Sequence, residues 1–198
     1  MKVFIAGVSS ETQYVGSQLS LYELARRAGD EMALEHRTRG DVAREGLVQT
    51  FLEKREFDAI LMLDADQRNQ NDLLEKLREA ADERDLDMVC AHYYKRDTRT
   101  VQSLCYELGD GTYPYLPYLH PPTEGLHEIA LTGFGCVLIR RRVLEAVRDS
   151  YPKGASPVGI GPMPEITGDY DNLGPDFRFF INARKLGYRL WLLADVES

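Results

Sequence analysis

The sequence predicts an α/β fold in which helices flank a mixed, mostly parallel central sheet. Short apolar runs alternate along the chain with amphipathic segments, in the order strand, helix, strand, helix, strand. The run at 59–63 is the clearest, because acidic residues bound it on both sides and it is too short for a typical helix. With 198 residues, 43% of them hydrophobic, the chain is expected to fold as a single domain, 1–198.

Three strands and three helices are expected in the first part of the chain. The strands are predicted at 3–8, 31–36 and 59–63. A helix at about 17–28 should end at Gly29. Its inward face is expected to comprise Leu19, Leu21, Leu24 and Ala25.

Two further helices are expected to begin at acidic or amide caps. Asp41 would cap the second helix, which ends before Phe57, and Asn71 or Asp72 would cap the third. The inward positions predicted for these two helices are Val42, Leu47, Val48, Phe51 and Leu52, and then Leu73, Leu74, Leu77 and Ala81.

The second part of the chain mixes regular elements with two irregular stretches. Strands are predicted at 88–94, 128–131, 136–139 and 188–193, and helices at about 141–147 and 177–187. The stretch 109–125 is rich in Gly, Pro and Tyr and is expected to be a binding loop without regular structure. The stretch 152–175 is expected to form a lid.

Composition restricts the possible partners. The net charge of −8 disfavours nucleic-acid binding. Cys90, Cys105 and Cys136 contain no CxxC pair, so they predict neither a zinc site nor a disulfide framework. No apolar run is long enough for a transmembrane segment, and the N-terminus lacks the apolar core of a signal peptide. A cytoplasmic protein is expected.

Two carboxylates mark the expected site. Asp64 and Asp66 follow the 59–63 run with one residue between them. In open α/β sheets, ligands bind outside the carboxyl ends of the strands. Carboxylates there suit a hard divalent cation, which in turn can hold a diphosphate.

Four blocks, in order, resemble GT-A glycosyltransferases of the family-2-like group, which have a Rossmann-like fold and use nucleotide sugars. DVAREG at 41–46 resembles the "ARN" helix, and LMLDADQ at 61–67 resembles the DXD strand. LTGFGCVLIRRRVLE at 131–145 resembles the "GxGxxLxRRxxxE" segment, and GPDFRFFINARKLGYRLW at 174–191 the "GEDxxFCxRAxxxGYxxW" segment. The resemblance covers about residues 40 to 192.

The resemblance implies a metal-dependent hexosyltransferase that moves a sugar from a UDP- or GDP-sugar to the hydroxyl of an unidentified acceptor. Asp64 would contact the ribose or the metal, and Asp66 would coordinate Mn²⁺ or Mg²⁺ on the diphosphate. Asp176 would be the general base; its alternative role is a plain helix cap. The implied nucleotide-sugar-binding residues are Val8, Ser9, Ser10, Glu11, Arg44, Asp64, Ala65, Gly133, Phe134 and Gly135.

The sequence departs from the family pattern at three places. Glu45 and Pro175 replace the expected Asn and Glu, and no histidine follows the last strand. Asp195 or Glu197 would then supply the third metal ligand, or the chain would be truncated at its C-terminus.

Other functions are possible for the same pattern. A catalytically inactive nucleotide-sugar-binding protein would keep both aspartates. A nucleotidyltransferase is disfavoured because segment 7–16 contains no lysine or arginine. A haloacid-dehalogenase-type phosphatase is disfavoured because Gly-Thr does not follow Asp66.

Overall fold

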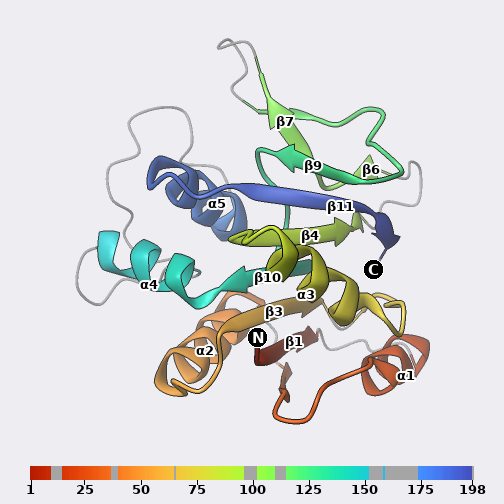
Figure 1. Cartoon of the computed structure of the whole chain (residues 1–198), viewed down its shortest axis with the longest axis vertical. Helices are drawn as coiled ribbons and strands as arrows, with labels where there is room; N and C mark the ends of the chain where they lie inside the picture. Colours follow the sequence, from red (N-terminus) through yellow and green to blue (C-terminus); the bar gives the residue numbers. More distant parts are fainter. Residues whose placement is uncertain are drawn as a thin grey trace.

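A mixed sheet of seven strands forms the centre of the computed structural model (Figure 1). The structure describes residues 1–9, 15–36, 40–64, 66–95, 102–109, 115–151, 158 and 174–197. The strand order is β2-β1-β3-β10-β4-β11-β9. The strands are β1 (Val3–Ser9), β2 (Glu31–His36), β3 (Ala59–Asp64), β4 (Met88–His92), β9 (Leu126–Ile129), β10 (Cys136–Arg140) and β11 (Leu190–Glu197).

The predicted α/β fold, with a mostly parallel sheet of Rossmann-like form, is confirmed. Strands β1, β2 and β3 are parallel to one another, and so are β4 and β11. Strand β10 runs antiparallel between β3 and β4, and β9 runs antiparallel at one edge. The carboxyl ends of β1, β3 and β4 therefore meet at one edge of the sheet, where the amino end of β10 also lies.

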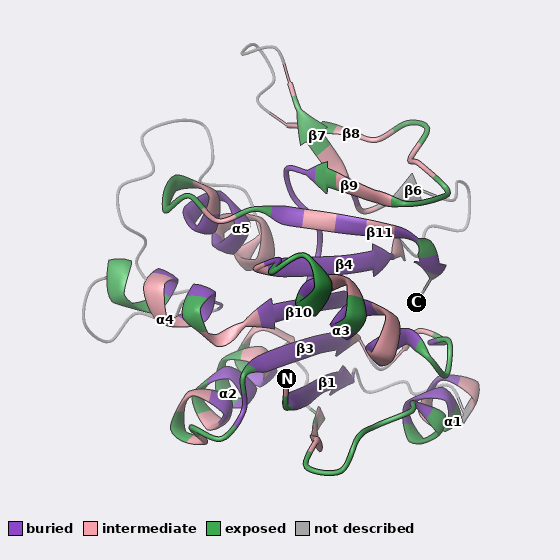
Figure 2. Ribbon diagram, in the orientation of Figure 1, coloured by how far each residue is buried: buried purple, intermediate pink, exposed green. Residues whose placement is uncertain are grey.

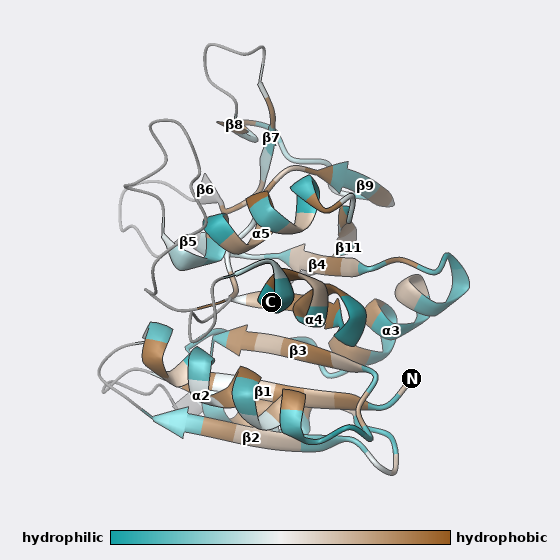
Figure 3. Cartoon of the chain, turned by 90° about the vertical axis from the view of Figure 1, so that its left-hand side faces the viewer, coloured by the Kyte–Doolittle hydropathy of each residue, from teal (hydrophilic) through white to brown (hydrophobic). Residues whose placement is uncertain are grey.

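Helices cover both faces of the sheet (Figures 1 and 3). One apolar core lies between the sheet and α2 (Gly40–Glu53), α4 (Arg141–Ser150) and α5 (Pro175–Lys185). A second lies between the opposite face and α1 (Val15–Glu23) and α3 (Leu73–Glu83). Because β1, β3 and β4 are covered on both faces, they are buried along almost their whole length, as Figure 2 shows.

The first helix is shorter than predicted. It ends at Glu23, so the buried Leu24 packs from the following loop rather than from the helix. The loop is fixed where the Ala25 amide donates to the Asn71 carbonyl at 2.8 Å. The predicted inward positions Leu19, Ala25 and Val42 are wrong, because all three side chains are exposed.

Of the predicted helix caps, Asp72 stands at the N-cap position, whereas Asp41 and Asp176 do not. Asp72 is the N-cap of α3 but makes no capping hydrogen bond, and its carboxylate instead pairs with Lys76 at 2.9 Å. Asp41 lies inside the first turn of α2, which begins at Gly40. Gly174 is the N-cap of α5, so Asp176 is not a plain helix cap.

A short hairpin extends the molecule beyond β9. It consists of β7 (Tyr106–Leu108) and β8 (Tyr115–Pro117), and a second small pair is formed by β5 (Tyr94–Lys95) and β6 (Gln102–Ser103). The prediction that 109–125 holds no regular element is therefore wrong at β8. Most of the predicted lid, 152–157 and 159–173, lies outside the described residues.

Arg140 and Arg141, at the junction of β10 and α4, donate hydrogen bonds to backbone carbonyls of neighbouring segments. Arg141 donates to the carbonyls of Phe51, Lys54 and Phe57 at 2.9, 2.7 and 2.7 Å, so it satisfies acceptors at the C-terminus of α2. Arg140 donates in the same way to carbonyls after and within α3. Both arginines lie at the end of β10 away from Asp64, so these contacts stabilise the fold rather than the site.

No helix among the described residues is long and apolar enough to cross a membrane.

Candidate functional site

The candidate site begins at the end of β3. Asp64 is the last residue of that strand, and Val8 of β1 is its neighbour in the parallel pairing. On the other side, the Asp64 amide donates to the Gly135 carbonyl at 2.9 Å, which extends the pairing between β3 and β10 by one bond. The Asp64 backbone is therefore held from two sides, and its side chain projects from the carboxyl edge of the sheet.

Arg44 of α2 pairs with the Asp64 carboxylate. Nη2 of Arg44 lies 2.5 Å from Oδ1 of Asp64, and only 17% and 15% of the two side chains are exposed. The guanidinium carbon also lies 5.8 Å from the centre of the Phe134 ring, within the range of a cation–π contact. The partial burial makes this ion pair stronger than a surface pair, and it fixes the guanidinium at the sheet edge.

Tyr93 holds the other oxygen of the same carboxylate. Its hydroxyl donates to Oδ2 of Asp64 at 3.0 Å. Burial, together with the charge of Asp64 and the hydrogen bond to it, raises the pKa of Tyr93 well above its usual value of 10.0. Tyr93 therefore remains a protonated donor at physiological pH.

The Gly133-Phe134-Gly135 turn lies against the Tyr93 ring. A Cβ atom added to Gly133 would be 2.7 Å from Cε1 of Tyr93, and one added to Gly135 would overlap the ring. Phe134 is buried and packs on Phe179 and Phe180 of α5. The turn is thus anchored by its central ring and presents bare backbone to Tyr93.

Asp176, in the first turn of α5, brings a second carboxylate to the site. Its Oδ1 accepts from the Phe177 amide at 3.0 Å, and its Oδ2 would lie 3.6 Å from a Cβ atom added to Gly133. Burial raises the pKa of Asp176, Arg44 opposes the rise, and Asp64 adds to it. The two carboxylates and Arg44 therefore interact within one site.

An aromatic pair lies beside Asp176. The rings of Tyr106 and Phe177 meet edge to face with their centres 4.9 Å apart. Burial and the nearby Asp176 charge raise the pKa of Tyr106. This pair places flat apolar surface next to a carboxylate, an arrangement that suits a ligand with both apolar and hydroxyl surface.

The end of β1 is linked to the end of β2. Oγ of the buried Ser9 lies 2.6 Å from Nδ1 of His36, the last residue of β2. Of the other residues predicted to bind the nucleotide, Ser10, Glu11 and Ala65 lie outside the described residues.

Metal ligands are sparse in the described part of the chain. No group of three His, Cys, Asp or Glu side chains there could hold an ion by itself. Asp66 lies in the turn after β3, while both oxygens of Asp64 already accept hydrogen bonds. Asp195, considered as a third ligand, accepts instead from the Gly125 amide at 3.0 Å. Mg²⁺ usually keeps several waters and binds through one or two carboxylates and substrate phosphates, so such an ion does not require three protein ligands.

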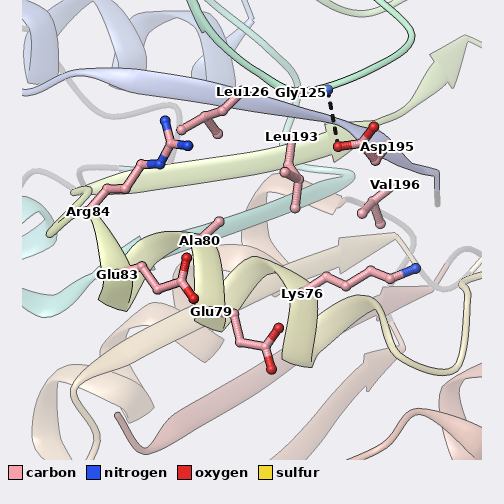
Figure 4. A pocket seen from close by; sticks show the side chains of 10 residues that line it. All are labelled: Lys76, Glu79, Ala80, Glu83, Arg84, Gly125, Leu126, Leu193, Asp195 and Val196. Carbon is pink, nitrogen blue, oxygen red and sulfur yellow. Dashed lines mark hydrogen bonds between the residues drawn. The ribbon is translucent and has the colours of Figure 1, made fainter.

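A separate groove lies on another part of the surface. It has a volume of about 350 Å³ and runs between α3 and the ends of β9 and β11 (Figure 4). Ala80, Leu126, Leu193 and Val196 give it an apolar lining, and charged side chains surround them. Apart from Asp195, it contains none of the predicted site residues.

Three site residues were not predicted from the sequence: Tyr93, Tyr106 and His36. Tyr93 and His36 stand at the carboxyl ends of β4 and β2. The strand-end argument that selected Asp64 would have selected His36 too, but it passes over Tyr93, which lies inside the strand predicted at 88–94. Tyr106 carried no such signal, because it reaches the site through a bridge to Leu131.

Comparisons with known proteins bear on the fold. No protein-family model matches the chain, and no curated protein matches it. Similar solved structures include A197 from STIV, with a TM-score of 0.65 and 19% identity over 100% of this chain and 84% of that one. They also include residues 1–349 of TarS from S. aureus, with a TM-score of 0.48 and 12% identity over 98% of this chain and 58% of that one. The likeness to A197 shows a shared fold.

Proposed function

We propose that the chain is a GT-A-type glycosyltransferase that moves a hexose from a UDP- or GDP-sugar to an acceptor hydroxyl. The observation that supports it most strongly is the meeting of Arg44, Asp64 and Asp176 at the carboxyl edge of a Rossmann-like sheet. A cation for the diphosphate, a carboxylate for the ribose and a buried carboxylate for the acceptor are the groups that such a transfer needs.

The donor would lie along the ends of β1 and β3. Val8, Ser9 and the following Ser10 and Glu11 would hold the base and ribose, with Ala65 next to the ribose carboxylate Asp64. The Arg44 guanidinium would face the diphosphate, because it is already fixed beside Asp64. Gly133, Phe134 and Gly135 would bound the site on the side of Asp176.

Asp66 would hold Mn²⁺ or Mg²⁺ together with the diphosphate oxygens. Such an ion supplies positive charge that stabilises the leaving nucleoside diphosphate. Arg44 supplies part of the same charge from the protein itself.

Asp176 would act as the general base. One of its oxygens would accept the proton of the acceptor hydroxyl as that hydroxyl oxygen bonds to the anomeric carbon of the sugar. The bond from the anomeric carbon to the diphosphate oxygen breaks, and the nucleoside diphosphate leaves with the electron pair. A carboxyl with a raised pKa is a stronger base than an ordinary aspartate, which favours this role.

Thermal unfolding tests the donor site. UDP, GDP, CDP and their common sugar conjugates would each be added with and without Mn²⁺ to the wild type and to Asp66→Ala. At a hundred times Kd, the matching nucleotide should raise Tm by about 5–10 °C. This shift should require Mn²⁺ and disappear in Asp66→Ala.

The matched control is Asp72→Ala, which removes an exposed carboxylate from the same segment. It should keep the full shift. If no nucleotide stabilises the wild type under any metal condition, the proposed function is wrong. Stabilisation without sugar transfer to any acceptor would instead favour a nucleotide-sugar-binding protein.

A further inference from the structure

The two glycines of the Gly133-Phe134-Gly135 turn face the side chain of Tyr93. The ring of Tyr93 occupies the space into which a side chain at either glycine would project. The two glycines therefore make room for the Tyr93 ring. They affect the ligand only indirectly, through the position of that ring. A ring held against bare backbone has little freedom to turn, so the hydroxyl is directed at one point.

That point is Oδ2 of Asp64. We infer that Tyr93 is a positioning residue, which fixes the Asp64 carboxylate so that it can accept hydrogen bonds from the ribose hydroxyls of the donor. This inference rests on the proposed function and adds a specific residue to it. The glycine turn, Tyr93 and Asp64 then form one unit, in which each part determines the placement of the next.

The hydrogen-bond capacity of Asp64 supports this role. An ionised carboxylate has about four acceptor sites on its two oxygens. Arg44 uses one site on Oδ1 and Tyr93 uses one on Oδ2, at 2.5 and 3.0 Å. Both oxygens are thereby held in place while each keeps acceptor capacity for a diol, which is the pattern that the 2′ and 3′ hydroxyls of a ribose present.

Charge also favours a tyrosine at this position. A second cation beside Asp64 would compete with the Arg44 contact to the carboxylate and reduce its use for the ligand. A neutral phenol adds a donor without adding charge. The charges of Asp64 and Asp176 both raise the pKa of Tyr93 and so favour the neutral phenol.

The test is nucleotide-sugar titration of Tyr93→Phe, which keeps the ring and removes only the hydroxyl. The donor that binds the wild type should bind Tyr93→Phe with a Kd up to about tenfold higher, because an Asp64 side chain that is no longer held at Oδ2 must be ordered when the donor binds. The Tm without ligand should fall by a few degrees, because the same hydrogen bond is lost from the free protein. Tyr22→Phe, at an exposed tyrosine of α1, is the matched control and should bind normally.

A double-mutant cycle separates positioning from direct contact. If Tyr93 acts through Asp64, adding Tyr93→Phe to Asp64→Ala should not raise Kd further. A further tenfold loss in the Asp64→Ala background would overturn the inference. So would an unchanged or lower Kd in Tyr93→Phe alone, the lower value meaning that the hydroxyl competes with the ligand.

The role of the glycines has a test that needs no ligand. Gly135→Ala should destabilise the wild type, because the methyl group displaces the Tyr93 ring, but should cost little in a Tyr93→Ala background. Gly46→Ala is the control, since an added Cβ there meets nothing within 4 Å. Equal costs of Gly135→Ala in both backgrounds would contradict the packing part of the inference.

These outcomes distinguish the inference from the proposed function. A wild type that binds no nucleotide sugar overturns both, whatever the stability cycle shows. A wild type that binds, together with a Tyr93→Phe variant that binds equally well, overturns only the role of Tyr93.

Discussion

Arg44 and Asp64 form an ion pair between the first turns of α2 and the last residue of β3, with 2.5 Å between Nη2 and Oδ1. The pair joins a helix to the strand end that carries the site, and it lies partly shielded from solvent. It balances the Asp64 charge while leaving a guanidinium at the position proposed for the diphosphate.

Replacing Arg44 should therefore weaken donor binding more than it lowers the stability of the fold. Arg44→Ala should raise the Kd for the nucleotide sugar at least tenfold, because a charge-assisted contact is lost. Arg44→Lys should recover only part of the affinity, since an ammonium lacks the planar fork. Calorimetric titration measures both, with Arg148→Ala, an exposed arginine of α4, as the control. Normal affinity in Arg44→Ala would remove this residue from the site.

Asp176→Asn should abolish transfer and stabilise the fold. The folded-state pKa of Asp176 is raised, so above that pKa the folded protein carries a charge that the unfolded chain accommodates more easily. Removing the charge should raise Tm at pH 7, and the gain should vanish below the unfolded value of about 3.8. Parallel melting curves at pH 7 and pH 3.5 measure it. A lower Tm at pH 7 would mean that the ionised form is the favoured one.

The pH dependence of transfer should show the same shifted group. A base must be ionised to accept a proton, so kcat should fall as pH decreases through the raised pKa of Asp176. The acid limb of the profile should therefore lie above the usual carboxyl value of about 3.8. An acid limb at or below that value would exclude Asp176 as the base.

Arg141→Ala should strongly destabilise the fold but leave the residues of the candidate site in place. Its guanidinium satisfies three backbone carbonyls near the end of α2 and stacks on the Phe51 ring at 4.1 Å. Losing these contacts should cost about 2–4 kcal/mol in urea unfolding. Arg142→Ala, at a largely exposed neighbour, should cost less than about 1 kcal/mol. Equal effects would contradict the structural role assigned to Arg141.

Arg78 makes the most deeply buried ion pair among the described residues. Its side chain is 0% exposed and pairs with Asp30, 1% exposed, at 2.6 Å. Arg78→Ala should cost about 3–5 kcal/mol, because Asp30 would remain buried without its cation. Lys76→Ala, in the exposed pair with Asp72, should cost no more than about 0.5 kcal/mol. Denaturant midpoints compare the two directly, and similar losses would refute the argument from burial.

Much of the sheet was predictable because its strands are buried on both faces. Apolar runs such as β1 and β3 were predicted nearly to the residue, since polar residues stand at both of their ends. The place of β10 between β3 and β4 was not predictable, because an apolar run does not reveal its partners or its direction. Leu19 was misplaced because the buried face of α1 includes two small polar residues, Ser17 and Ser20, which an apolar pattern does not reveal.

Several residues of the site were predictable from the sequence, but the contacts that join them were not. Arg44, Asp64, Gly135 and Asp176 carry motif signals, and the structure brings them together. Tyr93 carries none, because its hydrogen bond to Asp64 depends on strand order. The Tyr93 side chain reaches from the end of β4, past the turn that precedes β10, to Asp64 at the end of β3. These elements become neighbours only when the sheet is assembled.

A crystal structure of the chain with the nucleoside diphosphate that raises Tm most, grown with Mn²⁺, would locate the bound donor. In the proposed arrangement, the ribose lies on Asp64, the diphosphate lies between Arg44 and Asp66, and the Tyr93 ring stays against Gly133 and Gly135. A nucleotide bound in the groove between α3 and β11, or a sheet edge without nucleotide at saturating concentration, would contradict it.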